Sequence, residues 1–127
     1  MNTELYRAYL PFYLILSTVF GSFLNMLVWR VPRRESLAGR SHCFSCGHIL
    51  AGKDLIPIVS WLWLQGKCRY CGVQIPFRYL WLEVSMLITW TICWMVAQNP
   101  SQLFWACLGT TLFLFLVALF RSWPRKK

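Results

Sequence analysis

Four cysteines, arranged as two pairs, are the residues whose types and spacing most clearly predict chemistry in this chain. Two residues separate Cys43 from Cys46, and two separate Cys68 from Cys71. This spacing lets two thiolates on one tight turn reach a common metal ion at about 2.3 Å, and a second pair completes a tetrahedron. Four protein ligands leave no open coordination position, so the pattern predicts a structural rather than a catalytic Zn²⁺ site.

Disulfide bonds and a redox dithiol are the alternative interpretations of these cysteines. A redox motif needs only one Cys-x-x-Cys pair in a βαβ setting, which the flanking sequence does not offer. A cytoplasmic segment would keep thiols reduced, which argues against disulfides. His42 and His48 flank the first pair, and either could replace a cysteine, although surface histidines are the simpler interpretation. Cys93 and Cys107 stand alone in apolar segments, where free cysteines usually act as small apolar residues.

Both cysteine pairs lie in the one extended polar region of an otherwise apolar chain. Of its 127 residues, 57% are hydrophobic and 13% are charged, whereas soluble domains have about 45–50% and 25%. A helix of about 20 apolar residues crosses the hydrocarbon core of a bilayer. We therefore expect an all-α membrane protein with three transmembrane helices, at residues 10–29, 79–97 and 103–120.

The polar region, residues 30–78, is expected to form a zinc-ribbon-like loop domain between the first and second helices. Glycines and prolines punctuate it, so long helices are not expected there. About fifty residues with a single apolar run cannot form a sizeable core, and metal binding can supply the missing stability. That apolar run, residues 56–64, is too short to span a bilayer. We expect it to lie against the membrane surface or to pack on the metal-binding turns.

The distribution of basic residues predicts the topology. Residues 30–78 carry eight Lys and Arg against two acidic residues, and residues 121–127 carry four basic residues. Because cytoplasmic flanks of transmembrane helices are enriched in Lys and Arg, we expect the loop and the tail to be cytoplasmic. Residues 1–9 and the turn at 98–102 are then external. Aromatic residues that favour the membrane interface lie near the ends of the expected spans: Trp29, Tyr79, Trp81, Trp105 and Trp123.

This topology accounts for most of the net charge of +9. We therefore expect the positive charge to act at the lipid bilayer, and we do not expect a nucleic acid as a partner.

Among the remaining polar residues, Glu83 could pair with Arg78 or act as a helix N-terminal acid. Asp54 could cap a turn. An acidic group near a membrane interface is costly and is usually paired or functional, so Glu83 has the stronger functional case. Asn25 is expected to bond a neighbouring helix.

Residues 20–83 contain an ordered series of short motifs: Gly21-Ser22-Phe23-Leu24-Asn25, Arg30-Val31-Pro32, Glu35-Ser36, Arg40-Ser41-His42-Cys43, Cys46-Gly47-His48, Asp54-x-Ile56-Pro57-x-x-Ser60, Gly66-x-Cys68-x-x-Cys71, Ile75, Arg78-Tyr79 and Glu83. In this order they strongly resemble the N-terminal part of the bacterial type IV prepilin leader peptidase/N-methyltransferase family. Phe44 stands where the family often has proline, which is a minor departure.

The resemblance implies a protein of the bacterial inner membrane that acts in maturation of type IV pilins or type II secretion pseudopilins. Family members are membrane aspartyl peptidases that use two aspartates in later spans, one of them in a Gly-x-Gly-Asp setting. This chain has a single aspartate, Asp54, and an aspartyl protease needs two carboxylates that share a proton. We therefore expect the chain not to act as a peptidase on its own.

The family also methylates the new N-terminal amine of the cleaved pilin with S-adenosylmethionine, an activity associated with its cytoplasmic N-terminal part. Glu83 and Asp54 are the candidates for orienting that amine. The sequence contains no Gly-rich nucleotide loop after a strand, so it does not identify a site for S-adenosylmethionine. The alternatives are a non-enzymatic truncated remnant, one half of a split enzyme that pairs with a separate peptidase half, and a zinc-dependent docking scaffold for pilin precursors.

Overall fold

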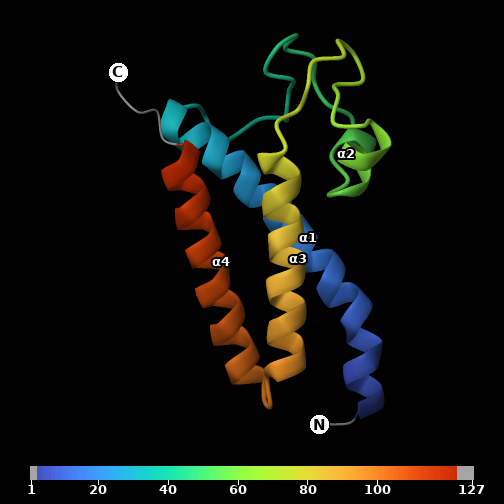
Figure 1. Ribbon diagram of the computed structural model, residues 1–127, viewed down its shortest axis with the longest axis vertical. Coiled ribbons are helices and arrows are strands. Elements are labelled where there is room, and N and C mark those ends of the chain that lie inside the picture. The colour runs from blue at the N-terminus through green and yellow to red at the C-terminus, as the bar shows by residue number, and fades with distance from the viewer. Residues whose placement is uncertain (1–2, 123–127) are drawn as a thin grey trace.

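Three long helices form the body of the protein, which is described by a computed structural model over residues 3–122, with side chains from residue 8 onward. They are α1 (Thr3–Arg33), α3 (Arg78–Val96) and α4 (Pro100–Ser122) (Figure 1). Each contains a segment long and apolar enough to cross a membrane, and the described residues contain no strand. The expectation of an all-α membrane protein with three spans is confirmed.

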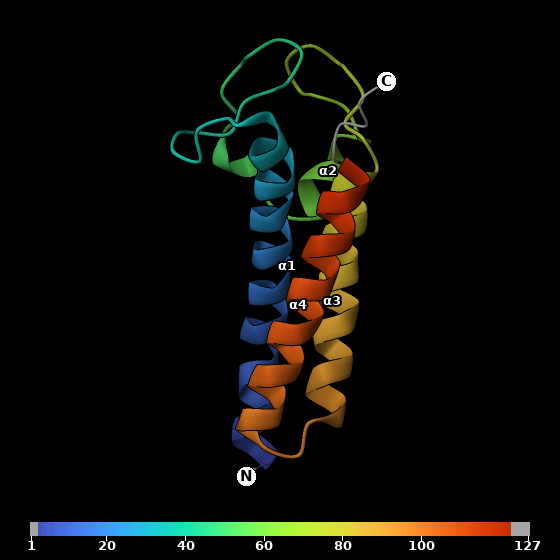
Figure 2. The same cartoon turned by 90° about the vertical axis from the view of Figure 1, so that its left-hand side faces the viewer.

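The helices run side by side along the long axis of the molecule (Figures 1 and 2). Their shared core consists of five buried residues, with Met86 fully enclosed: Leu24, Leu82, Met86, Trp90 and Cys107. The start of α1 and the turn between α3 and α4 lie at one end of the bundle. The cysteine-containing loop and the end of α4 lie at the other end, which is the arrangement that alternating spans require.

Helix α1 is longer than the span expected at residues 10–29, and its last turn includes Pro32. Proline has no N–H, so the carbonyl of Val28 loses its usual helical donor. The hydroxyl of Ser122, at the end of α4, donates to this carbonyl at 3.3 Å. The hydrogen bond compensates the proline and ties the ends of α1 and α4 together beside the loop.

Close contact between α1 and α3 begins at Gly21. A Cβ atom on this residue would lie 2.9 Å from the Cα of Glu83, so only glycine allows the two backbones to come this near. One turn further along α1, the Asn25 amide donates to the Tyr79 carbonyl at 2.8 Å. This hydrogen bond confirms the expected role of Asn25, and the close contact places Glu83 directly against α1.

The segment between α1 and α3 contains no long helix, as expected. It holds a short 3₁₀ helix, η1 (Gly52–Asp54), and a five-residue α-helix, α2 (Val59–Trp63). Two isolated antiparallel bridges, His42 with Ile49 and Lys67 with Gln74, close the remaining turns.

The isolated cysteines pack in the apolar core, as expected, although the Cys107 sulfur also lies 2.8 Å from the Tyr13 hydroxyl. Cys107 is part of the buried core and Cys93 packs against it. The expected interfacial residue Trp123 and residues 124–127 of the basic tail lie outside the described residues, and so do residues 1–2. Which part of each helix lies within the bilayer stays a prediction.

Candidate functional site

Two nearly identical turns hold the cysteine pairs. The glycine after each pair has a positive φ, 69° at Gly47 and 71° at Gly72, a conformation that residues with a side chain rarely adopt. This glycine donates its N–H to the carbonyl of the first cysteine at 2.9 Å in both turns. In the first turn the N–H of Ser45 also points at the Cys43 sulfur, at 3.4 Å. In both turns the glycine thus lets the backbone fold back toward the cysteines.

The four sulfur atoms of the two turns form one cluster. All lie within 4.8 Å of one another, and the Sγ atoms of Cys43 and Cys71 are 3.8 Å apart. Ligands at 2.3 Å around a tetrahedral zinc ion are separated by about 3.8 Å, whereas a disulfide bond measures about 2.05 Å. All six cysteines are free. The cluster of Cys43, Cys46, Cys68 and Cys71 could therefore hold a metal ion such as zinc.

Neither histidine beside the first pair joins the ligand group in the part of the chain that the structure describes. Both are exposed. The ring of His48 stacks on that of Tyr70, with centroids 3.6 Å apart, and so connects the two cysteine turns from the outside.

The thiols of the cluster differ in acidity. Burial would raise the pKa of Cys43, but hydrogen bonds from the N–H groups of Cys46 and Ser45 and from neighbouring thiols lower it to about 7. The N–H of Val73 favours the Cys71 thiolate, yet burial and the surrounding thiols outweigh it and raise the pKa to about 11. Four thiols packed this closely cannot all ionise without a compensating cation, and metal binding requires the thiolate form.

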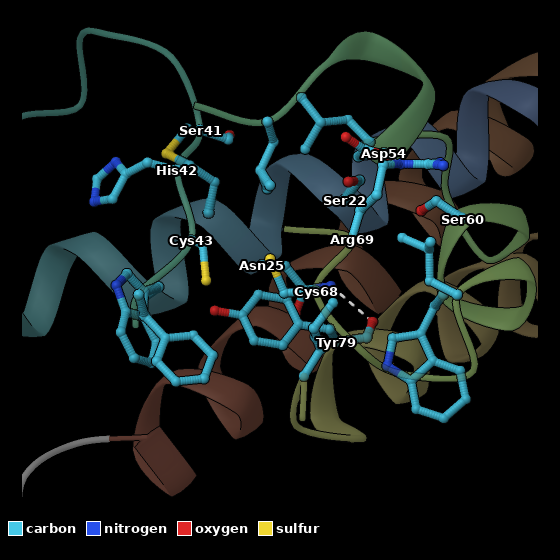
Figure 3. A pocket seen from close by; sticks show the side chains of 18 of the residues that line it. Ser22, Asn25, Ser41, His42, Cys43, Asp54, Ser60, Cys68, Arg69 and Tyr79 are labelled. Carbon is cyan, nitrogen blue, oxygen red and sulfur yellow. Dashed lines mark hydrogen bonds and ion pairs between the residues drawn. The ribbon is translucent and has the colours of Figure 1, made fainter. Parts of the chain in front are cut away.

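A cavity of about 180 Å³ lies between the cysteine turns and the adjoining ends of α1 and α3 (Figure 3). It brings together the two acidic residues singled out from the sequence, Asp54 and Glu83. Cys43 and Cys68 also line it, so a metal held by the cluster would fix part of the cavity wall. Polar side chains from α1 and the loop complete the lining, among them Ser22, Asn25, Ser41 and Ser60.

The carboxylate of Asp54 is fully engaged within the loop, and its side chain is only 2% exposed. One oxygen accepts the Nε–H of Arg69 at 2.7 Å, and the other accepts the Tyr70 hydroxyl at 3.2 Å and the Ala51 N–H at 3.3 Å. Burial would raise the pKa of Asp54, but the hydrogen bonds from Arg69 and Ala51 and the Arg69 charge lower it. The expected turn cap is confirmed, and Asp54 also anchors the second cysteine turn.

The carboxylate of Glu83 holds a strained turn in place. Its Oε2 accepts the N–H of Ile58 at 2.7 Å. Ile58 has φ 62° and ψ −53°, and the next N–H, on Val59, bonds the Pro57 carbonyl at 2.6 Å. This γ-turn with positive φ is rare, above all for a β-branched residue. A buried acidic group therefore fixes a backbone conformation that is unfavourable by itself.

Glu83 neither pairs with Arg78 nor acts as a helix N-terminal acid. It lies beyond the first turn of α3, and the one ion pair in the described part of the chain joins Asp54 to Arg69. The guanidinium of Arg78 instead lies 5.0 Å from the centre of the Trp29 ring.

Two residues with a role in this region were missed by the sequence analysis. Arg30 was interpreted only as a topology determinant, but it is 6% exposed and donates to the carbonyls of Ser36, Leu37, Ala38 and Arg40. Trp61 was seen as part of an apolar run. Its indole nitrogen is buried and has no hydrogen-bond partner among the described residues, and Trp61 lines the cavity.

Comparisons with known proteins point to one family. Residues 15–97 match the family model of the bacterial peptidase A24 N-terminal domain. The prepilin leader peptidase/N-methyltransferase of Myxococcus xanthus is 42% identical over 83 residues, which are 65% of this chain and 25% of the relative. The Vibrio cholerae protein of the same name is 32% identical over 124 residues, 90% of this chain and 49% of the relative.

A third relative, the type 4 prepilin-like proteins leader peptide-processing enzyme of Escherichia coli, is 30% identical over 119 residues, 79% of this chain and 43% of the relative. The chain thus spans between a quarter and a half of the length of these relatives. No solved structure matches it significantly.

Proposed function

The chain belongs to the prepilin leader peptidase/N-methyltransferase family, and on this premise we propose that it positions a pilin or pseudopilin N-terminus for methyl transfer. The buried carboxylate of Glu83, at the boundary between the cavity and α3, carries the proposal. We also propose that the protein lies in the bacterial inner membrane, with the cysteine loop and the C-terminal end of α4 in the cytoplasm. The basic loop supports this orientation.

In this proposal the four cysteines hold a structural zinc ion. The 3.8 Å separation of the Cys43 and Cys71 sulfurs and the donor set fit tetrahedral zinc. Cys43 and Cys68 lie in the cavity wall, so the metal-binding turns keep the cavity in shape. The ion has no direct part in methyl transfer, because its four positions are filled by protein ligands.

We assign to Glu83 the role of binding the substrate amine. Methyl transfer from a sulfonium requires a neutral amine in line with a bound donor. The Glu83 carboxylate attracts a cationic amine into the cavity and can accept its proton. A carboxylate has about four acceptor positions, and the Ile58 N–H and the side chains of Ser22 and Asn25 do not fill them all. Asp54 is the weaker candidate, because its charge is already paired with the Arg69 guanidinium, whereas no ion pair of the described residues involves Glu83.

S-adenosylmethionine, which supplies the methyl group when bound, is proposed to enter the same cavity. Trp61 supports this assignment, because its buried N–H lacks a partner in the described residues and suits the carboxylate of that molecule. The indole ring also offers a π face, which favours a nearby cation such as a sulfonium.

Cleavage of the leader peptide is a separate requirement. It needs two aspartates, and Asp54 is the one aspartate among these 127 residues. We propose that sequence outside these residues, or a second polypeptide, supplies the peptidase aspartates.

Glu83→Gln tests the proposed methyl transfer. The amide oxygen can still accept the Ile58 N–H, so the strained turn is kept while the negative charge is removed. We expect the transfer of labelled methyl groups from S-adenosylmethionine to a processed pilin peptide to fall about 100-fold, the range for loss of a proton acceptor. The measurement uses the whole chain in lipid nanodiscs.

Thr89→Val is the matched control. Thr89 lies on the same helix, and its hydroxyl donates to carbonyls of that helix; it does not line the cavity. Its methyl transfer should equal that of the original chain. Undiminished transfer by Glu83→Gln would contradict the assignment of Glu83. A chain that binds the processed peptide but transfers no methyl group would indicate a docking scaffold instead.

A further inference from the structure

Helix α2 presents an apolar face with no partner in the described structure. Val59, Leu62 and Trp63 occupy positions i, i+3 and i+4, which lie on one side of a helix. Their exposed fractions are 56%, 58% and 77%. Residues 55–66 contain no charged side chain, so the face also lacks the charged rim that a surface helix of a soluble domain usually carries.

The hydrogen bond between Ile58 and Glu83 sets the depth of this face relative to the bundle. Ile58 directly precedes α2 and is held 2.7 Å from the Glu83 carboxylate. Glu83 is five residues beyond Arg78, where α3 begins, which is about 7.5 Å along a helix axis. Since α3 is a candidate membrane span, the turn that leads into α2 lies below the loop-side end of a transmembrane helix.

The figures agree with this depth. In both views α2 lies below the two cysteine turns and level with the loop-side turns of α3 (Figures 1 and 2). The cysteine turns extend beyond the ends of the helices, whereas α2 does not. An apolar helix at this level, beside the bundle, lies where the headgroups of a bilayer meet its acyl chains.

We infer that α2 is an interfacial membrane anchor, with Val59, Leu62 and Trp63 in contact with lipid. An interfacial helix buries its apolar face about 5–10 Å into the headgroup and acyl boundary, which matches the depth set by Glu83. Tryptophan is enriched at this level of a bilayer. The Glu83 carboxylate satisfies the Ile58 N–H, as backbone at membrane depth requires.

Lipid explains this face better than a protein partner does. Its exposed residues are aliphatic or aromatic, and a specific protein interface would add a polar rim to fix the orientation. The depth relative to α3 also places the face beside lipid rather than in water. The inference rests on α3 spanning the bilayer and is independent of the proposed methyl transfer.

Photo-crosslinking of the whole chain tests the anchor. The photoreactive residue p-benzoylphenylalanine replaces Trp63 in one variant and Leu62 in a second, which guards against failure of either to fold. A third variant carries it in place of Ile49, an apolar residue of the first cysteine turn that is 52% exposed. Each is reconstituted in vesicles of phosphatidylethanolamine and phosphatidylglycerol, and adducts are identified by mass spectrometry.

We expect phospholipid adducts from positions 62 and 63 and none from position 49. Equal lipid labelling at position 49 would overturn the inference, because the cysteine turns would then be at the same depth. Lipid-free adducts to a second copy of the chain at 62 and 63 would also overturn it, because the face would then be a protein interface. Unchanged metal content in all three variants shows that the loop is folded in each.

Discussion

Cys68→Ser is expected to release the bound metal and to leave the loop between α1 and α3 open to proteases. The reason is that this loop has almost no core of its own. Of the buried apolar side chains in the described structure, the only two between Arg34 and Phe77 belong to Cys43 and Cys68. Structural zinc contributes about 10–16 kcal/mol in small zinc-dependent domains, so we expect metal binding to replace the missing hydrophobic core.

The expected result is measured as metal content and as the rate of limited proteolysis, with the protein in a bilayer. Cys93→Ala is the control, since Cys93 lies within α3 and outside the cluster. It should keep the metal and the resistance of the loop. Full metal content and full protease resistance in Cys68→Ser would mean that something other than the cluster folds the loop.

Gly21→Val is expected to force α1 and α3 apart and to lower the stability of the bundle. Even the first side-chain atom would lie 2.9 Å from the Glu83 Cα, and this neighbour is backbone that cannot rotate away. Overpacking of this kind costs about 1–3 kcal/mol or more. Displacement of Glu83 would also disturb its hydrogen bond to Ile58, so the cavity should change with the bundle.

The loss of stability is measured as the thermal unfolding temperature of the original chain and of the variants, all in one detergent. Gly109→Val in α4 is the matched control, because a Cβ atom there meets no heavy atom within 4 Å. The substitution replaces a helical glycine in both cases, so the difference isolates the contact between helices. If both variants unfold at the same temperature, the close contact of α1 and α3 does not exist in solution.

The sequence predicted those features that depend on local patterns. Continuous apolar segments revealed the three long helices, and the Cys-x-x-Cys spacing revealed the two turns of the cluster. Both features are determined by neighbours within a few residues. Asn25 was also placed correctly, because an amide within an apolar helix has few partners other than the next helix.

The contacts that assemble the cavity depend on the fold and were not predicted. Glu83 and Ile58 are 25 residues apart, and Asp54 and Arg69 are 15 apart. Apart from the five-residue α2 and the first turn of α3, the chain between them is irregular, so no local sequence pattern brings them together. The strained turn at Ile58 carried no signal, since positive φ is normally marked by glycine or asparagine. The extension of α1 beyond residue 29 was missed, because a proline such as Pro32 usually ends a helix. The hydrogen bond that replaces the missing proline N–H comes from Ser122, which lies in another helix.

One series of contacts connects the cysteine cluster to the helix bundle. The cluster holds the two cysteine turns, and Asp54 joins η1 to the second turn through Arg69 and Tyr70. On the far side of the cavity, Glu83 joins α3 to the turn that precedes α2. The loop is thus attached to the bundle at a buried acidic group, and we expect its shape to depend on the four sulfur atoms.

X-ray absorption spectroscopy at the zinc edge, on the whole chain purified in lipid, is the most direct test of those four sulfur atoms. We expect one zinc ion per chain, with four sulfur neighbours at about 2.3 Å. Nitrogen or oxygen neighbours in place of sulfur, or sulfurs found bonded to one another without metal, would show that the loop is organised in a different way.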